Sequence, residues 1–166
     1  MKKFLYLAMA AAACLALFAS CEKNDLNHTG DDTGNLYGAW ALTTKTTVTT
    51  SSDGTQTSKD VDYTDHHFYL VFSEFPFPHV IAKKGSLGAL DLDDVDVDAV
   101  GFAYDAQDKT LTFKKTVWLS DDLLTYNMTL NGTFEVTELS KSRLVIRQTS
   151  LGVTTVYTYR KELKEE

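Results

Sequence analysis

Closely spaced carboxylates form the most chemically suggestive pattern in this chain. The stretch "DLDDVDVDAV" contains Asp94, Asp96 and Asp98. On a strand, side chains two residues apart share one face, and Ca²⁺ prefers clustered oxygen ligands, taking roughly six to eight of them. The spacing does not match an EF-hand, because Ala99 stands where that loop needs a glycine. Two interpretations remain, a calcium site formed by these three aspartates or a solvated acidic face with valines packed beneath it.

The other reactive side chains form no recognisable active site. His66 and His67 are adjacent, and neighbours on a strand point to opposite faces, so the pair does not predict a zinc site. The chain contains no Gly-x-Ser-x-Gly motif and no glycine-rich phosphate loop. Carboxylate pairs are plentiful, and none is singled out as a glycosidase dyad. We therefore expect a protein that is not an enzyme and has no cofactor, unless calcium binds the acidic cluster.

The first twenty residues have the layout of a secretory signal. Two lysines precede an apolar run from Phe4 to Phe18, as in the charged and apolar regions of signal peptides. The run is shorter than the roughly 17–25 apolar residues of a membrane-spanning helix, so a transmembrane anchor is the weaker interpretation. Cys14 lies inside this segment, and its removal leaves Cys21 as the one cysteine of the mature chain, with no intrachain disulfide available.

The residues before Cys21 resemble a bacterial lipobox, with apolar Leu17 followed by small Ala19 and Ser20. The resemblance implies that residues 1–20 are a lipoprotein signal peptide and that Cys21 becomes the acylated first residue. Each buried methylene contributes about 0.8 kcal/mol, so stable anchoring takes more than one acyl chain, and lipoprotein processing supplies more than one. The alternative is ordinary signal cleavage that leaves Cys21 as a free thiol.

Residues 21–35 are polar and acidic, which predicts a flexible tether. Acidic residues directly after a lipidated cysteine resemble the export signals of Bacteroidetes surface lipoproteins. That resemblance implies export, lipid anchoring to the outer membrane through Cys21, and a domain on the cell surface. The net charge is −7 for the whole chain and −9 after Ser20, because Lys2 and Lys3 are the only charged residues before that point. An acidic surface repels phosphate backbones, so we expect no nucleic-acid partner, and no feature identifies a protein partner.

Alternating apolar and polar residues predict one all-β domain over residues 36–163. The expected strands lie near 40–48, 57–64, 66–75, 100–105, 110–113, 124–136, 143–150 and 153–162. Asp53-Gly54, Ala106–Lys109 and Leu151-Gly152 are the expected turns between neighbouring strands. In the first strand, Trp40, Leu42 and Thr44 are expected on one face.

The stretch around Asn131-Gly132 offers two interpretations. The dipeptide is the strongest short hairpin signal. A two-residue turn there, however, would bury Glu135 and expose Phe134, because the apolar residues on both sides have even numbers. We therefore favour one continuous strand, with the next turn at Ser140–Ser142.

About eight short antiparallel strands predict an up-and-down barrel or a barrel-like sandwich. One short helix is expected near 78–84, because Pro78 suits a first helical position and Gly85 follows two lysines as a helix end would. Residues 75–98 form one long insertion, which we expect to cover one end of the sheet structure.

The first and last strands resemble those of lipocalin-like domains in Bacteroidetes lipoproteins. The first contains Gly38-x-Trp40, and the C-terminal stretch ends in an alternating leucine strand and a last strand finishing Tyr159-x-Lys161. The resemblance implies a lipocalin-like barrel with Trp40 closing its base, often under an arginine from a late strand. Arg143 and Arg147 have the parity opposite to the apolar residues of their strand, so that role stays unfilled.

Two functions follow from this predicted barrel, because a small barrel can be filled by its own side chains or hold one small ligand. In the first, a lipid-anchored cell-surface protein binds a small apolar or amphipathic ligand. In the second, a filled barrel acts as a surface interaction or inhibitor protein through its loops and acidic face. The candidates to line a ligand cavity are Trp40, Phe68, Leu70, Tyr104, Tyr126, Met128, Tyr157 and Tyr159.

Overall fold

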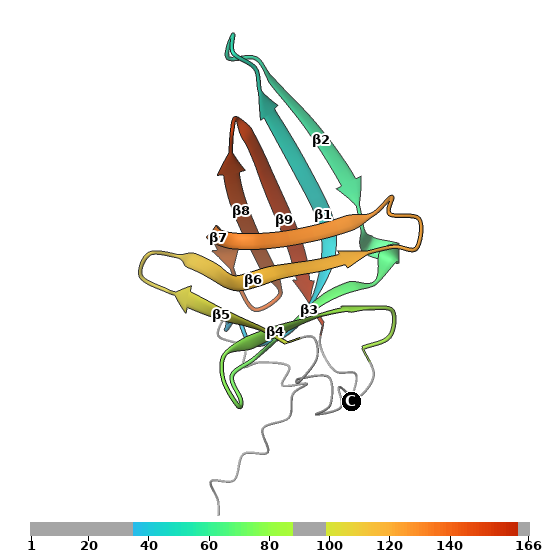
Figure 1. The fold of residues 1–166 in the computed structure, drawn as a ribbon, viewed down its shortest axis with the longest axis vertical. Helices are drawn as coiled ribbons and strands as arrows, with labels where there is room; N and C mark the ends of the chain where they lie inside the picture. Colours follow the sequence, from blue (N-terminus) through green and yellow to red (C-terminus); the bar gives the residue numbers. More distant parts are fainter. Residues whose placement is uncertain (1–34, 88–98, 163–166) are drawn as a thin grey trace, which may run out of the picture.

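The strands follow one another around a closed antiparallel barrel (Figure 1). The computed structural model describes residues 35–87 and 99–162. The elements are β1 (Gly38–Thr50), β2 (Gln56–Asp62), the 3₁₀ turn η1 (Thr64–His66), β3 (Phe68–Ser73), β4 (His79–Lys84), β5 (Val100–Asp105), β6 (Thr110–Ser120), β7 (Asn127–Leu139), β8 (Arg143–Ser150) and β9 (Val153–Lys161). Eight strands close the barrel through the pairing of β1 with β9, and β2 is the extra strand. The predicted all-β, up-and-down barrel is confirmed.

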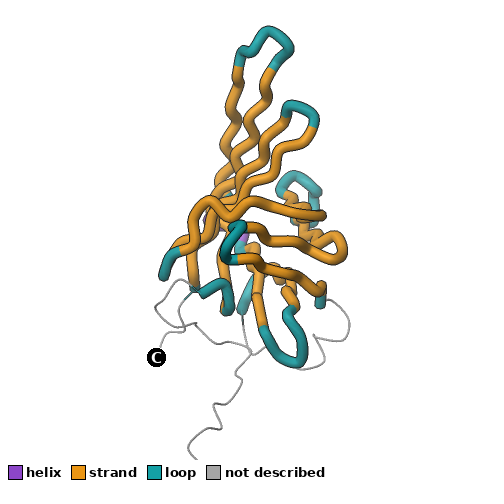
Figure 2. The backbone as a smooth tube through the Cα atoms, turned by 90° about the vertical axis from the view of Figure 1, so that its left-hand side faces the viewer, coloured by secondary structure: helices purple, strands orange, loops and turns teal. Residues whose placement is uncertain are grey.

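Strand β1 takes part in both the barrel and a projecting sheet. Its first residues pair with β3, and its later residues pair with β2, while β9 runs along its other side. The outer parts of β1, β2, β8 and β9 therefore extend beyond the barrel as a four-stranded blade, seen at the top of Figures 1 and 2. We call the barrel end at which β1 begins the base, and the end at which β1 continues into the blade the mouth.

The barrel interior is filled by large apolar side chains from every barrel strand. Along β3, β6, β7, β8 and β9, and in β1 as far as Leu42, the alternating residues predicted to face inward are buried. Aromatic rings pack edge to face inside, with Phe72 against Phe102 at 5.1 Å and Phe113 against Phe134 at 5.7 Å between ring centroids. Such pairs add to the free energy of area burial, so the interior is a packed core.

The predicted helix near 78–84 is wrong, because these residues form strand β4. All six residues of β4 pair in register with β3, from Ser73↔His79 to Phe68↔Lys84. Val80 and Ile81 are both buried, on opposite faces of the strand. A strand that is buried on both faces shows no alternation of apolar and polar residues. The prediction therefore depended on Pro78 and Gly85, which are typical of helix ends.

The continuous strand through Asn131 and Gly132 is confirmed, since both lie inside β7. The irregularity lies on the partner strand β6. Phe113 pairs with Gly132 and the next pair is Val117 with Leu130, so β6 has extra residues there and bulges opposite Asn131. The turns predicted at Asp53-Gly54, Ala106–Lys109, Ser140–Ser142 and Leu151-Gly152 also lie between strands.

A second bulge corrects the predicted face of β1. Leu42 pairs with Tyr159 and Thr44 with Thr158, so Thr43 is an extra residue that shifts the alternation. Beyond it Lys45, and not Thr44, lies opposite Tyr157 on the inner face. The bulge therefore brings a cation to the mouth of the barrel.

Candidate functional site

Most of the predicted cavity-lining residues lie in the packed core. Trp40, Phe68, Leu70, Met128, Tyr157 and Tyr159 are all 3% exposed or less. Tyr104 and Tyr126 are half-buried, and they lie near opposite ends of the barrel. The interior side chains contact one another, so these two tyrosines are the predicted residues that a ligand could reach.

The two buried tyrosines of β9 satisfy their hydroxyls within the core. The hydroxyl of Tyr157 donates to the backbone carbonyl of Thr129 at 3.1 Å, and that of Tyr159 to the sulfur of Met128 at 3.2 Å. Burial raises the pKa of Tyr157 to about 12 and that of Tyr159 well above its ordinary value. Charging either phenol inside the apolar interior is unfavourable.

These raised pKa values predict a loss of stability at alkaline pH. Between pH 10 and about 12 the unfolded chain releases the Tyr157 proton while the folded chain keeps it, so the free energy of unfolding falls by about 2–3 kcal/mol. Tyr159 acts in the same direction. Urea unfolding at intervals of pH should record this fall.

The matched variant for this effect is Tyr157→Phe. It should cost about 1 kcal/mol at pH 8, because the carbonyl of Thr129 loses its donor. It should also reduce the alkaline fall by about 2–3 kcal/mol. Equal alkaline falls in the two proteins would contradict the assignment.

An aromatic and polar cluster closes the mouth. The ring of Tyr126 stacks on His66, with centroids 3.6 Å apart, and meets Tyr63 edge to face. The Tyr63 hydroxyl donates to the carbonyl of Asn127 at 2.7 Å. Lys45 donates to the same carbonyl and to the side-chain oxygen of Asn127, both at 3.2 Å. Desolvation lowers the pKa of Lys45, and the contacts tie β1 to β7 across the mouth.

Trp40 lies at the base of the barrel and is fully buried. Its indole N–H donates to the carbonyl of Leu36 at 2.7 Å. The ammonium of Lys161 lies 4.8 Å from the indole centroid and donates to the carbonyl of Asn35 at 3.0 Å. Lys161, at the end of β9, thus places a cation over the ring of Trp40. The sequence contained the signal, because Lys161 continues the odd-numbered inner face of β9 begun by Tyr157.

The two arginines of β8 point outward, as their parity predicts. Arg147 pairs with Glu135 and Arg143 with Glu138, both on β7. All four side chains are substantially exposed, so these pairs contribute little to stability. Neither arginine reaches Trp40.

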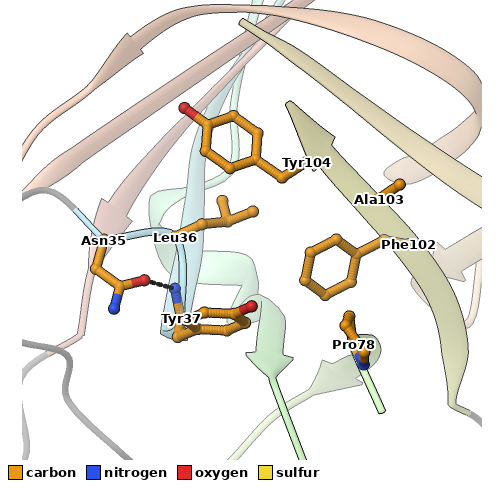
Figure 3. Close-up of a pocket in the computed structure, with 7 residues that line it drawn as sticks. All are labelled: Asn35, Leu36, Tyr37, Pro78, Phe102, Ala103 and Tyr104. Atoms are coloured by element: carbon orange, nitrogen blue, oxygen red, sulfur yellow. Dashed lines mark hydrogen bonds between the residues drawn. The ribbon is translucent and has the colours of Figure 1, made fainter. Parts of the chain in front are cut away.

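A hollow of about 330 Å³ lies at the base, outside the packed interior. It is lined by Asn35, Leu36, Tyr37, Pro78, Phe102, Ala103 and Tyr104. Figure 3 shows the segment before β1 on one side and β5 on the other, with Pro78 below. The volume is at the lower end of the range for small-molecule sites, roughly 300–1,000 Å³.

The local fold explains why the hollow opens here. Leu36 is held under Trp40 and is 3% exposed, so the segment before β1 lies across the base. Strands β4 and β5 share only two residue pairs, His79↔Gly101 and Val80↔Val100. The sheet is therefore least continuous beside Pro78, next to the space between β5 and the lead segment.

The hollow combines apolar walls with polar groups at its rim. The rings of Tyr37 and Phe102 face each other at 6.3 Å, tilted by 53°. Asn35 accepts the backbone N–H of Tyr37 through its side-chain oxygen. Among the described residues, nothing hydrogen-bonds the amide nitrogen of Asn35 or the hydroxyls of Tyr37 and Tyr104. Three donors thus border an aromatic slot.

Burial affects the two rim tyrosines as well. Desolvation and then the charge of Glu74 raise the pKa of Tyr37. Desolvation and then Asp105 raise the pKa of Tyr104. Both hydroxyls stay protonated at neutral pH and can donate hydrogen bonds to an acceptor. The sequence identified Tyr104 but not the other residues of this site, which come from three separate segments.

Several predicted features lie outside the described residues, namely Cys21, the signal peptide 1–20, most of the tether 21–35 and the aspartates Asp94, Asp96 and Asp98. Within residues 35–87 and 99–162, no group of three His, Cys, Asp or Glu side chains is arranged to hold a metal ion. The same part of the chain contains no helix that is long and apolar enough to cross a membrane.

The comparisons with known proteins returned no family model, no curated protein and no solved structure that matches this chain.

Proposed function

We propose that this chain is a lipid-anchored cell-surface barrel that binds a small amphipathic ligand at its base. The observation that carries the proposal is the hollow lined by Tyr37 and Phe102, which combines aromatic walls with three hydrogen-bond donors. The packed interior argues against a ligand inside the barrel. The acylation of Cys21 rests on the lipobox resemblance and adds the membrane as a partner.

The donors at the rim indicate the chemistry of the ligand. An apolar ring or short chain would pack in the hollow against the rings of Tyr37 and Phe102, and an ether, carbonyl or hydroxyl oxygen would accept from Asn35 or Tyr104. Ligand sites in general combine mostly apolar walls with a few placed polar groups. Among the described residues that line the hollow there is no cation, so the site favours a neutral polar group over a carboxylate.

The two half-buried tyrosines provide a matched pair of variants for this proposal. N-phenyl-1-naphthylamine, whose fluorescence rises in apolar sites, serves as the probe. Tyr104→Ala removes one wall of the hollow and should weaken dye binding about tenfold. Tyr126→Ala removes the same group near the mouth and should leave binding within about twofold of the wild type.

Equal loss in the two variants, or none in either, would refute binding at the base. Tyr104→Phe refines the test, because it keeps the ring and removes only the hydroxyl. It should retain dye binding, since the dye needs the wall and offers no oxygen acceptor.

A second candidate function, contact with another protein, is favoured by the β6–β7 turn. Leu123 and Leu124 are 84% and 65% exposed there, and Trp118 nearby on β6 is 57% exposed. Leu124 has a φ of +57°, a conformation that a leucine seldom adopts. Exposed apolar side chains on a strained turn suit a docking contact. If the wild type retained another surface protein in a pull-down and Leu123→Ser did not, while dye binding stayed unchanged, this candidate would be supported.

A further inference from the structure

The β3–β4 turn exposes two phenylalanine rings at the base of the barrel. The turn runs from Glu74 to Pro78, and Phe75 and Phe77 within it are 55% and 47% exposed. Each phenylalanine precedes a proline, in the sequence "FPFPH". Large rings exposed side by side in one turn are unusual for a chain whose other phenylalanines, among the described residues, are buried.

The turn is held in place by its own flanking side chains. Ser73 donates its hydroxyl to the carbonyl of Phe75 at 3.2 Å. His79, which is fully buried, has its Nδ1 2.7 Å from the carbonyl of Phe77 and donates to it. Two prolines remove two further backbone donors. The turn therefore presents its rings with little conformational freedom left to lose and with few backbone groups that need water.

The turn also lies at the end of the barrel from which the N-terminal segment emerges. Gly38, the first residue of β1, pairs with Phe72, which is next to Ser73 at the start of the turn. Fourteen residues separate Cys21 from this end, and even fully extended they reach only about 50 Å. The blade tip lies thirteen residues of β1 farther along the chain, about 43 Å from the base, so the base is the end of the barrel nearer to Cys21 along the chain.

The charge on the turn indicates which kind of lipid headgroup, anionic or zwitterionic, the turn would contact. Glu74 is the one charged residue between Ser73 and His79, and its field reaches Tyr37. An anionic headgroup layer would repel this carboxylate, whereas a zwitterionic layer would not. Apolar rings with a single acidic neighbour thus fit the interface of a neutral bilayer.

We infer that the β3–β4 turn inserts Phe75 and Phe77 into the headgroup region of the bilayer that holds the acylated Cys21. This inference rests on the proposed lipid anchor and specifies how the barrel sits on it. The base faces the lipid and the blade points away. The hollow beside Pro78 then opens toward the membrane, where an amphipathic ligand would be concentrated.

Tryptophan quenching by brominated lipids tests this orientation. The full acylated chain is placed in phosphatidylcholine vesicles whose acyl chains carry bromine near the headgroup. In the double variant Phe77→Trp, Trp118→Phe, the new tryptophan reports on the turn. The wild type provides the control, because its exposed Trp118 lies on the mouth half of β6. Trp40 is buried in both proteins and adds the same background.

We expect the turn tryptophan to be quenched about threefold or more strongly than Trp118. Interfacial side chains are buried only about 5–10 Å deep, which places the turn tryptophan near the bromine atoms and leaves Trp118 far from them. Phe75→Trp in the same background repeats the measurement from the neighbouring ring. Weak quenching at both turn positions in a protein shown to be acylated would overturn the orientation and leave the anchor standing. Stronger quenching of Trp118 would also overturn it, since the barrel would then lie the other way.

An intact mass without acyl groups would overturn both the anchor and the orientation. That outcome is read before any vesicle is made, so the two failures are distinguishable.

Discussion

Replacing Trp40 by alanine should lower the free energy of unfolding by about 3–5 kcal/mol, the largest effect of any single side chain in the barrel. The indole is fully buried at the base. Its loss leaves a cavity, frees the carbonyl of Leu36 and removes the ring beneath the ammonium of Lys161. Domains of this size are stable by roughly 5–15 kcal/mol, so the variant would be folded only marginally.

The second tryptophan provides the control for this measurement. Trp118→Ala makes the same substitution at a side chain that is 57% exposed, and it should cost less than about 1 kcal/mol. Urea unfolding followed by far-ultraviolet circular dichroism reports both values without depending on tryptophan emission. Similar losses in the two variants would contradict the role of Trp40 at the base.

Cys21→Ser should release the protein from the membrane almost completely. The proposed anchor is a thioether from Cys21 to a diacylglyceryl group, and serine cannot form this bond, so the variant loses the acyl chains that would hold it in the membrane once residues 1–20 are removed. Membrane and aqueous fractions of expressing cells, compared by immunoblot, measure the change.

Cys14→Ser is the matched control, because it places the same substitution inside the expected signal peptide. It should leave the protein in the membrane fraction. If Cys21→Ser stayed in that fraction with residues 1–20 removed, the anchor would not depend on Cys21, and the lipobox interpretation would be wrong.

The architecture was predictable where side-chain alternation carried enough information. Around Asn131 and Gly132 the hairpin signal conflicted with the alternation. The strand continued, because a turn there would have buried Glu135 and exposed Phe134. The free energy of burying a whole apolar face exceeds the local preference of two residues.

Prediction failed where the signal was short or the alternation shifted. Residues 79–84 have too few positions to separate a strand from a helix, and burial on both faces removed the alternation. The bulge at Thr43 moved Lys45 to the inner face. A bulge that contains no glycine has no recognisable pattern in the neighbouring residues.

The candidate site was only partly predictable for a different reason. The sequence identified Tyr104, and Phe102 lies on the same face of β5 two residues before it. The opposite wall, Leu36 and Tyr37, precedes the first strand, and only the closed barrel brings it across the base. A site built from segments far apart in the chain leaves no spacing pattern in the sequence.

The most direct test of binding at the base of a filled barrel is a crystal structure of residues 22–166 grown with 4-iodophenol. This small amphipathic probe has one apolar ring and one hydroxyl, and the anomalous signal of iodine locates it without ambiguity. Binding at the base predicts an iodine peak in the hollow that Tyr37 and Phe102 line. A peak inside the barrel, among Met128, Leu130 and Tyr157, would contradict the filled interior on which the proposal depends.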